Sequence, residues 1–218
     1  MTAVGEPTYY APTEERINVM SHAVALLFSI AGLLALVTRA LLHGNTWHLV
    51  SFSVFAISLI ALYTASTAYH STRDPSLRIR LRTVDHATIY VLIAGTYTPF
   101  AMVTLQGSTG WLLFAITWGM AVTGIVLKLF FTGRYNQVST LMYVFMGWLI
   151  MFFIKPLIAQ FPSAGLAWLL AGGISYTLGA VIYSIPKVPY HHAIFHLFVV
   201  LGSFCHFIAV YAYVLPRA

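Results

Sequence analysis

Charged residues are scarce in this chain of 218 residues. Asp, Glu, Lys and Arg together make up 7% of it, whereas 60% of the residues are hydrophobic and the mean hydropathy is +0.84. Soluble domains carry roughly 25% charged residues, so the composition excludes a water-soluble fold. Because apolar segments occupy nearly the whole length, the chain has room for one membrane domain and for no soluble domain.

Cysteine is almost absent as well, since Cys205 is the only one. No intrachain disulfide and no cysteine-rich zinc site can therefore form. Acidic residues are also few, which leaves a formal net charge of +6. In a soluble protein this charge would suggest nucleic acid as a partner, but here the basic residues stand in short loops between apolar segments. The charge therefore indicates membrane topology, and we expect no nucleic-acid partner.

A secretory signal is not expected at the N-terminus. Glu6, Glu14 and Glu15 precede the first apolar run, which is longer than the ~7–15 residues of a signal-peptide core. The first apolar segment should therefore stay in the protein. Residues 1–14 contain two prolines and little apolar periodicity, which predicts an exposed tail ahead of a single membrane domain over residues 15–218.

Seven apolar segments follow, separated by turn signals that contain Gly, Pro or Asn. Each is about as long as the ~20 residues that an α-helix needs to cross a bilayer. Because the loops are short, segments adjacent in sequence should pack side by side. The sequence thus predicts an all-α bundle of seven transmembrane helices, with approximate ranges 17–42, 46–70, 84–105, 111–131, 138–158, 164–185 and 190–215.

The basic residues predict the orientation of this bundle. Cytoplasmic loops of membrane proteins are enriched in Lys and Arg. The loops after the second, fourth and sixth segments hold most of these residues, which predicts a cytoplasmic N-terminus and an outer C-terminus in the inner or plasma membrane. The richer side carries Arg73, Arg78, Arg80, Arg82, Lys128, Arg134 and Lys187, and the other side carries Arg39, Lys155 and Arg217.

Ionisable residues gather at the predicted cytoplasmic ends of the segments. His192 and His196 are four residues apart, so on a helix they share one face and can share one metal ion. The predicted orientation brings His70 and Asp85 to the same depth. Three imidazoles and an exchangeable water form a catalytic zinc site. We therefore expect His70, His192 and His196 to bind Zn²⁺, and Asp85 to orient the water or act as a general base.

Further polar residues are expected around these ligands, because ligating histidines usually pass their second N–H to a neighbouring acceptor. Ser66 lies one turn before His70, and Glu15, Asn18 and His22 share one face of the first segment. Ser66 could instead bond to its own helix backbone. Glu15 could equally cap its helix or contact an arginine.

A structural interpretation stands beside the metal-binding one. His192 and His196 could be polar residues that pack at a helix interface, and Asp85 could be an anion that the dipole favours at a helix N-terminus. His206, one to two turns from the far end, is expected to make a structural hydrogen bond. His86 is expected to point away from the site.

The polar residues resemble the three motifs of the progestin and adipoQ receptor superfamily, and the short chain is most similar to its bacterial branch, the haemolysin III-like proteins. The resemblance implies seven helices, a cytoplasmic N-terminus, zinc bound by His70, His192 and His196, and Asp85 reaching the metal through water. It also implies kinship with membrane-embedded amide and ester hydrolases such as alkaline ceramidases. The motifs are Glu15-x-x-Asn18-x-x-x-His22, Ser66-x-x-x-His70 followed by Asp85, and His192-x-x-x-His196 with His206-Phe207 beyond.

The leading functional hypothesis is a zinc-dependent membrane hydrolase that cleaves an amide or ester bond in a lipid-like substrate. Membrane lipids and a lipophilic small molecule are the expected partners, because a polar substrate would have to desolvate to reach the site. The first alternative is a sensor or regulator of membrane state in which zinc is purely structural. A pore-forming haemolysin ranks lowest, because a secreted pore former must first be soluble. No oligomeric state follows from the sequence.

Overall fold

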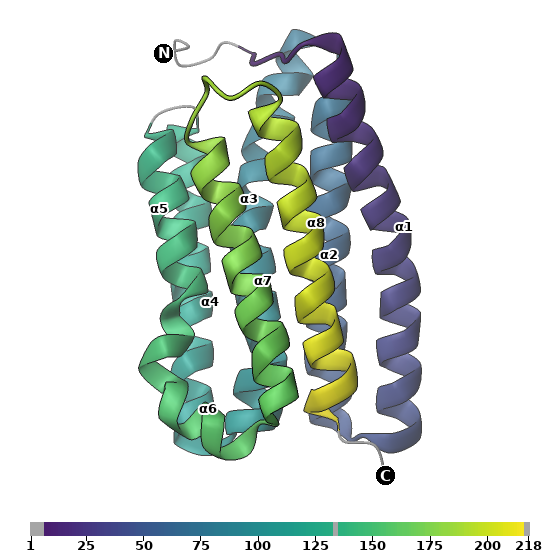
Figure 1. Cartoon of the computed structure of the whole chain (residues 1–218), viewed down its shortest axis with the longest axis vertical. Helices are drawn as coiled ribbons and strands as arrows, with labels where there is room; N and C mark the ends of the chain where they lie inside the picture. The colour runs from purple at the N-terminus through teal and green to yellow at the C-terminus, as the bar shows by residue number, and fades with distance from the viewer. Residues whose placement is uncertain (1–6, 133–134, 216–218) are drawn as a thin grey trace.

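The structure, a computed structural model of the chain, describes residues 7–132 and 135–215. Every regular element within these residues is helical. Seven stretches are long and apolar enough to cross a membrane, which confirms the predicted all-α seven-helix membrane bundle. The helices stand side by side, and α1 begins at the end of the bundle opposite to the one where α8 finishes (Figure 1). An odd number of crossings requires this arrangement.

The elements that form the crossings are all packed lengthwise in the bundle. In chain order they are α1 (Pro12–His43), α2 (Thr46–Ser71), α3 (Pro75–Pro99) with a π-helical continuation (Phe100–Leu105), α4 (Gly107–Phe131), α5 (Asn136–Gly147), a 3₁₀ stretch (Leu149–Phe153), α6 (Ile154–Gln160), α7 (Ser163–Tyr183), and α8 (His191–Ala209) with a π-helical end (Val210–Val214).

Two helices begin earlier than the membrane segments that we predicted. Helix α1 begins at Pro12 and α3 at Pro75, rather than near residues 17 and 84. Proline is favoured in a first turn, where its missing N–H has no intrahelical partner anyway. Asp74 caps α3, because its side chain accepts a hydrogen bond of 2.7 Å from the backbone of the first turn. Hydropathy detects only the apolar part of such helices, so it did not predict their polar first turns.

The extra turns change the setting of the basic residues used to predict topology. Arg78, Arg80 and Arg82 all lie on helix α3, where the side chains of Arg78 and Arg82 are buried against the protein. Lys128 is buried in the last turns of α4. The loop positions expected for them are therefore corrected. Arg134 and Arg217 lie outside the described residues.

The fifth crossing is interrupted, although we predicted one continuous segment there. Helix α5 ends at Gly147, and α6 begins after the 3₁₀ stretch. The Tyr97 hydroxyl bridges the break, because it donates to Gly147 O at 2.7 Å and accepts from Ile150 N at 3.0 Å. Unsatisfied backbone groups are costly inside a membrane. Pro156 lies in the first turn of α6, where a missing N–H is tolerated.

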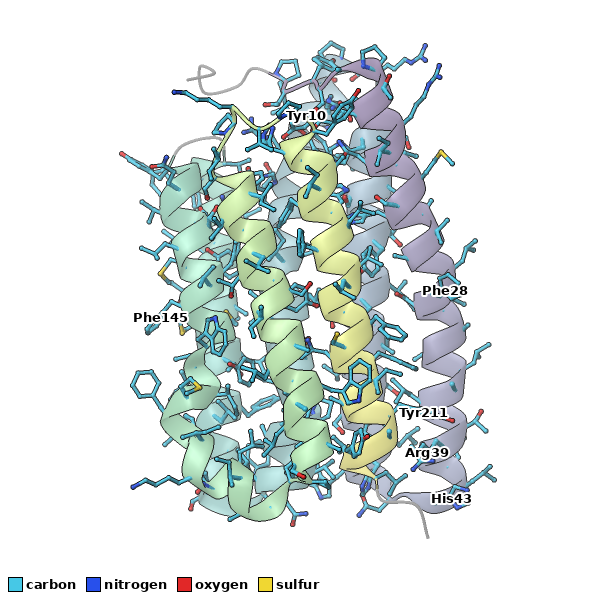
Figure 2. All side chains as sticks on the ribbon, viewed as in Figure 1. Tyr10, Phe28, Arg39, His43, Phe145 and Tyr211 are labelled. Carbon is cyan, nitrogen blue, oxygen red and sulfur yellow. The ribbon has the colours of Figure 1, made fainter. Side chains whose placement is uncertain are left out.

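Helices adjacent in sequence pack against each other through α4, α7 packs on α8, and α1 closes the ring by packing on α8. The outer surface is apolar: Phe28 and Phe145 point away from the bundle on opposite sides (Figure 2). This surface is suited to contact with lipid. At the far end Arg39 lies over the ring of Tyr211, with its guanidinium carbon 5.1 Å from the ring centroid.

Gly124 allows α4 to approach α3 closely. A Cβ added to Gly124 would lie 2.4 Å from the ring of Tyr90, which is buried on α3. Gly119 lies on the exposed side of the same helix, and a Cβ there would meet no atom within 4 Å. The two glycines therefore form a matched pair for testing this contact.

We expect Gly124→Ala to lower the free energy of unfolding by about 1–3 kcal/mol, because the added methyl forces the Tyr90 ring out of its place. Gly119→Ala adds the same methyl in open space and should be neutral, or stabilise by up to ~1 kcal/mol. Thermal unfolding of both variants in one detergent checks this. Equal effects of the two substitutions would contradict the close approach of Gly124 to the Tyr90 ring.

Candidate metal centre

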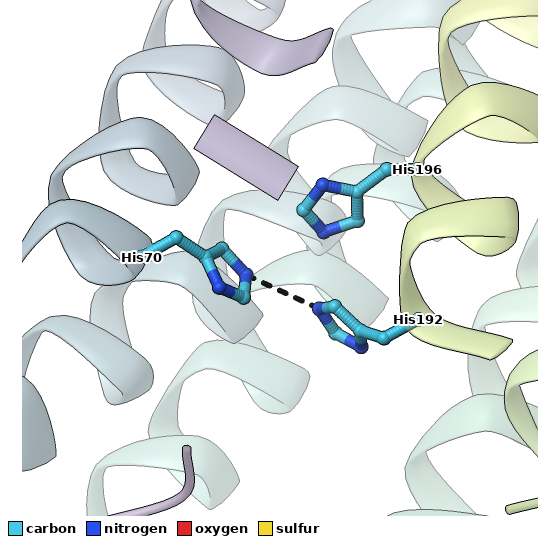
Figure 3. A group of neighbouring side chains, drawn as sticks. All are labelled: His70, His192 and His196. Carbon is cyan, nitrogen blue, oxygen red and sulfur yellow. Dashed lines mark hydrogen bonds between the residues drawn. The ribbon is translucent and has the colours of Figure 1, made fainter. Parts of the chain in front are cut away.

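Three imidazoles meet inside the bundle near the start of α1. His70 lies in the last turn of α2, and His192 and His196 lie in the first turns of α8. All three are buried, and one ring nitrogen from each lies within 4.8 Å of the others. The Nε2 atoms of His70 and His192 are 3.1 Å apart. Figure 3 shows the three rings turned toward one another. The predicted grouping of these histidines is therefore present.

The hydrogen bonds of two rings leave Nε2 available as a metal ligand. His70 Nδ1 is 2.7 Å from Glu15 Oε2. Because a carboxylate can only accept, Nδ1 carries the hydrogen and the neutral ring keeps a lone pair on Nε2. His192 Nδ1 lies 2.9 Å from the Tyr10 hydroxyl, which allows the same tautomer. Three imidazole nitrogens suit a transition metal rather than Mg²⁺ or Ca²⁺, which prefer oxygen ligands. The residues therefore fit a metal ion.

Arg78 positions His70 by holding the end of α2. Its NH1 group donates to the backbone carbonyls of Tyr69, His70 and Thr72, at 3.2, 3.4 and 3.0 Å, so it caps the last turn of α2. Its NH2 group forms an ion pair with Glu15, whose other oxygen holds His70. Glu15 and Arg78 together therefore hold the His70 ring in place. From the sequence we used Arg78 only to predict topology, and we left open a contact between Glu15 and an arginine.

The start of α8 is held by a residue of α1. The Glu14 Oε1 atom accepts hydrogen bonds from the backbone N–H groups of His192, at 3.1 Å, and Ala193, at 3.4 Å. A negative side chain at a helix N-terminus satisfies free N–H groups and interacts favourably with the dipole. Glu14 therefore positions both histidines of α8. No local pattern could reveal a cap supplied from the opposite end of the chain.

Tyr10 covers the three-histidine cluster, which differs from the exposed tail predicted for residues 1–14. Its ring stacks on His192 with 4.3 Å between centroids. Burial raises the pKa of the Tyr10 hydroxyl well above its usual range, so the group is protonated at neutral pH. The preceding Thr8 offers its carbonyl to Arg78 Nε at 2.7 Å, which anchors the segment. Residues 1–6 of the predicted tail lie outside the described residues.

Asp85 lines the same cavity as His192 and His196 and is buried on α3. Its Oδ2 lies 3.4 Å from His86 Nδ1, which also lies 2.8 Å from Arg82 O. The structure therefore brings Asp85 to the cavity but not into the group of three ligands. His86 lines the cavity too, which corrects the expectation that it points away from the site. The role of Asp85 as a base stays a prediction.

The polar residues expected around the three histidines lie close to them, but their hydrogen-bond partners differ from those predicted. Ser66 bonds His22 Nδ1, at 2.7 Å, instead of His70 or its own backbone. The His22 ring stacks on His196 with 3.7 Å between centroids and an interplanar angle of 5°. Asn18 Nδ2 reaches His70 Nδ1 only at 3.5 Å, which is a weak contact. Within the described part of the chain, His196 Nδ1 is buried without a hydrogen-bond partner.

A cavity of about 400 Å³ opens from the metal centre toward the middle of the bundle. Polar groups gather at its metal end, where Asp85 and Lys128 join the histidines. The remainder extends between α3, α5, α7 and α8 to His206 and is lined mainly by apolar and aromatic side chains, among them Leu92, Phe100, Leu157 and Val199. A long hydrophobic molecule with a polar end matches this distribution.

These features define the class of protein: a seven-helix membrane bundle with a buried three-histidine cluster that can hold a metal ion, at one end of an apolar cavity. A model of the family described as "Haemolysin-III related" matches residues 10–207. The chain therefore belongs to the haemolysin III-related family.

The relatives of the chain agree with this assignment. It is 45% identical over 205 residues to Hemolysin-3 of Bacillus cereus, and the aligned region covers 94% of each chain. It is 43% identical to a Hemolysin-3 homolog of Bacillus subtilis (strain 168), over 92% of this chain and 94% of the relative. It is 26% identical to the ADIPOR-like receptor IZH2 of Saccharomyces cerevisiae, over 88% of this chain and 69% of the relative. The last match is consistent with the bacterial branch of the progestin and adipoQ receptor superfamily.

Replacing Glu15 by glutamine should weaken metal binding by about 10–100-fold, because the His70 ring loses its charged acceptor while all three ligands stay in place. Titration of the purified protein with Co²⁺ in competition with a chelator measures the change. His43→Ala removes an exposed imidazole at the other end of α1 and should leave the affinity unaltered. A Glu15→Gln variant that binds Co²⁺ as tightly as the wild type would contradict this role.

Proposed function

We propose that the protein is a zinc-dependent hydrolase of the inner or plasma membrane that cleaves an amide or ester bond in a lipid-like substrate. The observation that carries this proposal is the position of the three-histidine cluster, which is buried beside a mainly apolar cavity that His192 and His196 line. Metal ligands for a purely structural purpose do not need such a cavity. A lipophilic substrate could reach the cluster with its hydrocarbon part in the cavity.

His70, His192 and His196 would hold the zinc ion. Their donor type and spacing support this, and Glu15 and Tyr10 would keep two of the rings in the required tautomer. When bound, zinc would supply Lewis-acid chemistry, polarising a carbonyl and lowering the pKa of a bound water to roughly 7.

Asp85 would take the proton from the attacking water. It is a carboxylate at the cavity wall, with one oxygen 3.4 Å from the His86 ring. A general base must lie within hydrogen-bond reach of the proton that it abstracts, directly or through one water. The shared cavity is compatible with the second of these arrangements. The apolar wall would exclude bulk water from the reacting groups.

Removal of two ligands should abolish stoichiometric zinc. We expect the wild type purified in detergent to carry about one zinc per chain, and the His192→Ala, His196→Ala double variant to carry close to none, because one imidazole alone cannot retain the ion. Elemental analysis of both proteins measures this. A wild type without stoichiometric zinc would remove the basis of the proposal.

Asp85→Asn separates catalysis from metal binding. The substitution keeps the size of the side chain but removes the base, so hydrolysis should fall by about 10²–10⁴-fold while the zinc content stays unchanged. Product formation from a panel of ceramides and acylglycerols in detergent micelles, measured beside zinc content, tests both parts. Full hydrolysis by the zinc-loaded Asp85→Asn variant would exclude the proposed base.

A membrane sensor with structural zinc is the second candidate. Contacts around the three-histidine cluster favour it, because His70 on α2 and His192 on α8 face each other, and Glu15 and Glu14 of α1 bond one of them each. A metal held by the three histidines would join α2 directly to α8. Full cellular activity of the Asp85→Asn variant, without any lipid product from the wild type, would support this candidate over the hydrolase.

Membrane lysis ranks third and rests on the name of the Bacillus cereus relative, Hemolysin-3. The uniformly apolar outer surface argues against a protein that is first soluble and then inserts. Leakage of dye from liposomes at low protein ratios, with the same efficiency for the His192→Ala variant, would restore this candidate.

A further inference from the structure

The cavity contains a second polar position far from the metal centre. His206 on α8 and Tyr176 on α7 both line it. Their rings are stacked, with 5.3 Å between centroids and an interplanar angle of 21°. Ten residues of α8 separate His196 from His206, which corresponds to about 15 Å at a rise of ~1.5 Å per residue. The pair therefore lies deep in the part of the cavity that is otherwise apolar.

The hydrogen bond of His206 leaves an acceptor toward the cavity. His206 Nδ1 lies 2.8 Å from the backbone carbonyl oxygen of Gly202. A carbonyl can only accept, so Nδ1 carries the hydrogen. A charged imidazole is costly in apolar surroundings, and in the neutral ring Nε2 then holds a lone pair. Within the described residues no hydrogen bond reaches this atom. It is therefore available to accept one from a ligand.

The hydroxyl of Tyr176 is available as a donor for a related reason. Ser203 Oγ accepts a hydrogen bond of 2.7 Å from Tyr63 and lies 2.9 Å from the Tyr176 hydroxyl. Ser203 is buried, and its single hydrogen is satisfied if it donates to the Tyr176 oxygen. The hydrogen of Tyr176, a residue that lines the cavity, is then left for a second acceptor. The two stacked rings thus offer one donor and one acceptor.

Two glycines make room for this pair of rings. A Cβ at Gly172 would lie 2.3 Å from His206 Nδ1, and a Cβ at Gly202 would lie 2.6 Å from the Tyr176 ring. Each ring therefore packs directly on the backbone of the facing helix. Any other residue at either position would push its ring away, so the backbone of both helices holds the donor and the acceptor in place.

We propose that His206 and Tyr176 bind a hydroxyl group on the hydrocarbon part of the ligand, about 15 Å from the metal centre. A hydroxyl can donate to His206 Nε2 and accept from Tyr176 at the same time, which a plain alkyl chain cannot. The inference deepens the proposed function and rests on it for the position of the ligand's polar end. It identifies the substrate class as lipids with a hydroxylated chain.

Binding of matched fatty acids tests the site without requiring turnover. The probes are octadecanoic acid, its 12-hydroxy derivative, whose hydroxyl lies at about this distance from the carboxylate, and its 6-hydroxy derivative. Each competes with a fluorescent fatty acid for the wild type in detergent. We expect the 12-hydroxy acid to bind about tenfold more tightly than the parent acid, as one or two buried hydrogen bonds provide. The 6-hydroxy acid should bind no more tightly than the parent.

Variants assign the preference to the two side chains. His206→Phe and Tyr176→Phe should each reduce the ratio of the two affinities to about onefold to threefold, because each removes one of the hydrogen bonds. Tyr176→Phe deletes only a hydroxyl, so it remains informative if His206→Phe does not fold. Phe204→Leu, on the exposed face of the same helix, is the control and should keep the wild-type ratio.

Equal binding of the three acids by the wild type would overturn the inference, and so would a preference that survives both variants. Zinc content and hydrolysis are measured on the same samples. A protein with zinc and turnover but no preference loses only the hydroxyl site. A protein without zinc or turnover that still prefers the 12-hydroxy acid loses only the proposed hydrolase function.

Discussion

The ion pair between the buried Arg78 and the partly buried Glu15 is the contact on which the three-histidine cluster depends. Glu15 gives one oxygen to Arg78 and the other to His70, while Arg78 caps the carbonyls at the end of α2. Removing Glu15 would leave the buried Arg78 guanidinium without its carboxylate partner, and a buried charge is costly when unpaired. The pair therefore holds α1, α2 and α3 in one arrangement, and with them the orientation of one ligand.

The second half of the site is built by the same kind of interaction. Glu14 satisfies the first N–H groups of α8, and Tyr10 packs on His192. Water cannot satisfy polar groups inside a membrane, so these groups have to find partners within the protein. Adjacent acids on α1 thus hold ligands on two different helices. This explains why α1 starts well before its apolar segment.

The two polar positions in the cavity differ in what surrounds them. At the histidine end, imidazoles, carboxylates and cations from several helices lie together, and the Nε2 atoms of His70 and His192 are 3.1 Å apart. At the deep end, His206 and Tyr176 line a mainly apolar part of the cavity. Under the proposed function, metal binding and recognition of the hydrocarbon chain would be separated along α8, which carries a histidine at each position.

The sequence by itself determined the number of crossings and the identity of the histidine cluster. Apolar length identifies a membrane helix whatever its neighbours are, and the four-residue spacing of His192 and His196 places them on one face. The distribution of the basic residues placed His70 at the same membrane depth as this pair. These conclusions depend on local or one-dimensional patterns, which a single sequence contains in full.

Only the tertiary structure decided which groups hold the ligands. Tyr10, Glu14 and Arg78 act across long sequence separations, so no spacing marks them, and Ser66 proved to bond His22 rather than His70. The break between α5 and α6 and the pairing of His206 with Tyr176 likewise arise from contacts between helices. Helix rotation and packing set such contacts, and hydropathy carries no information about either.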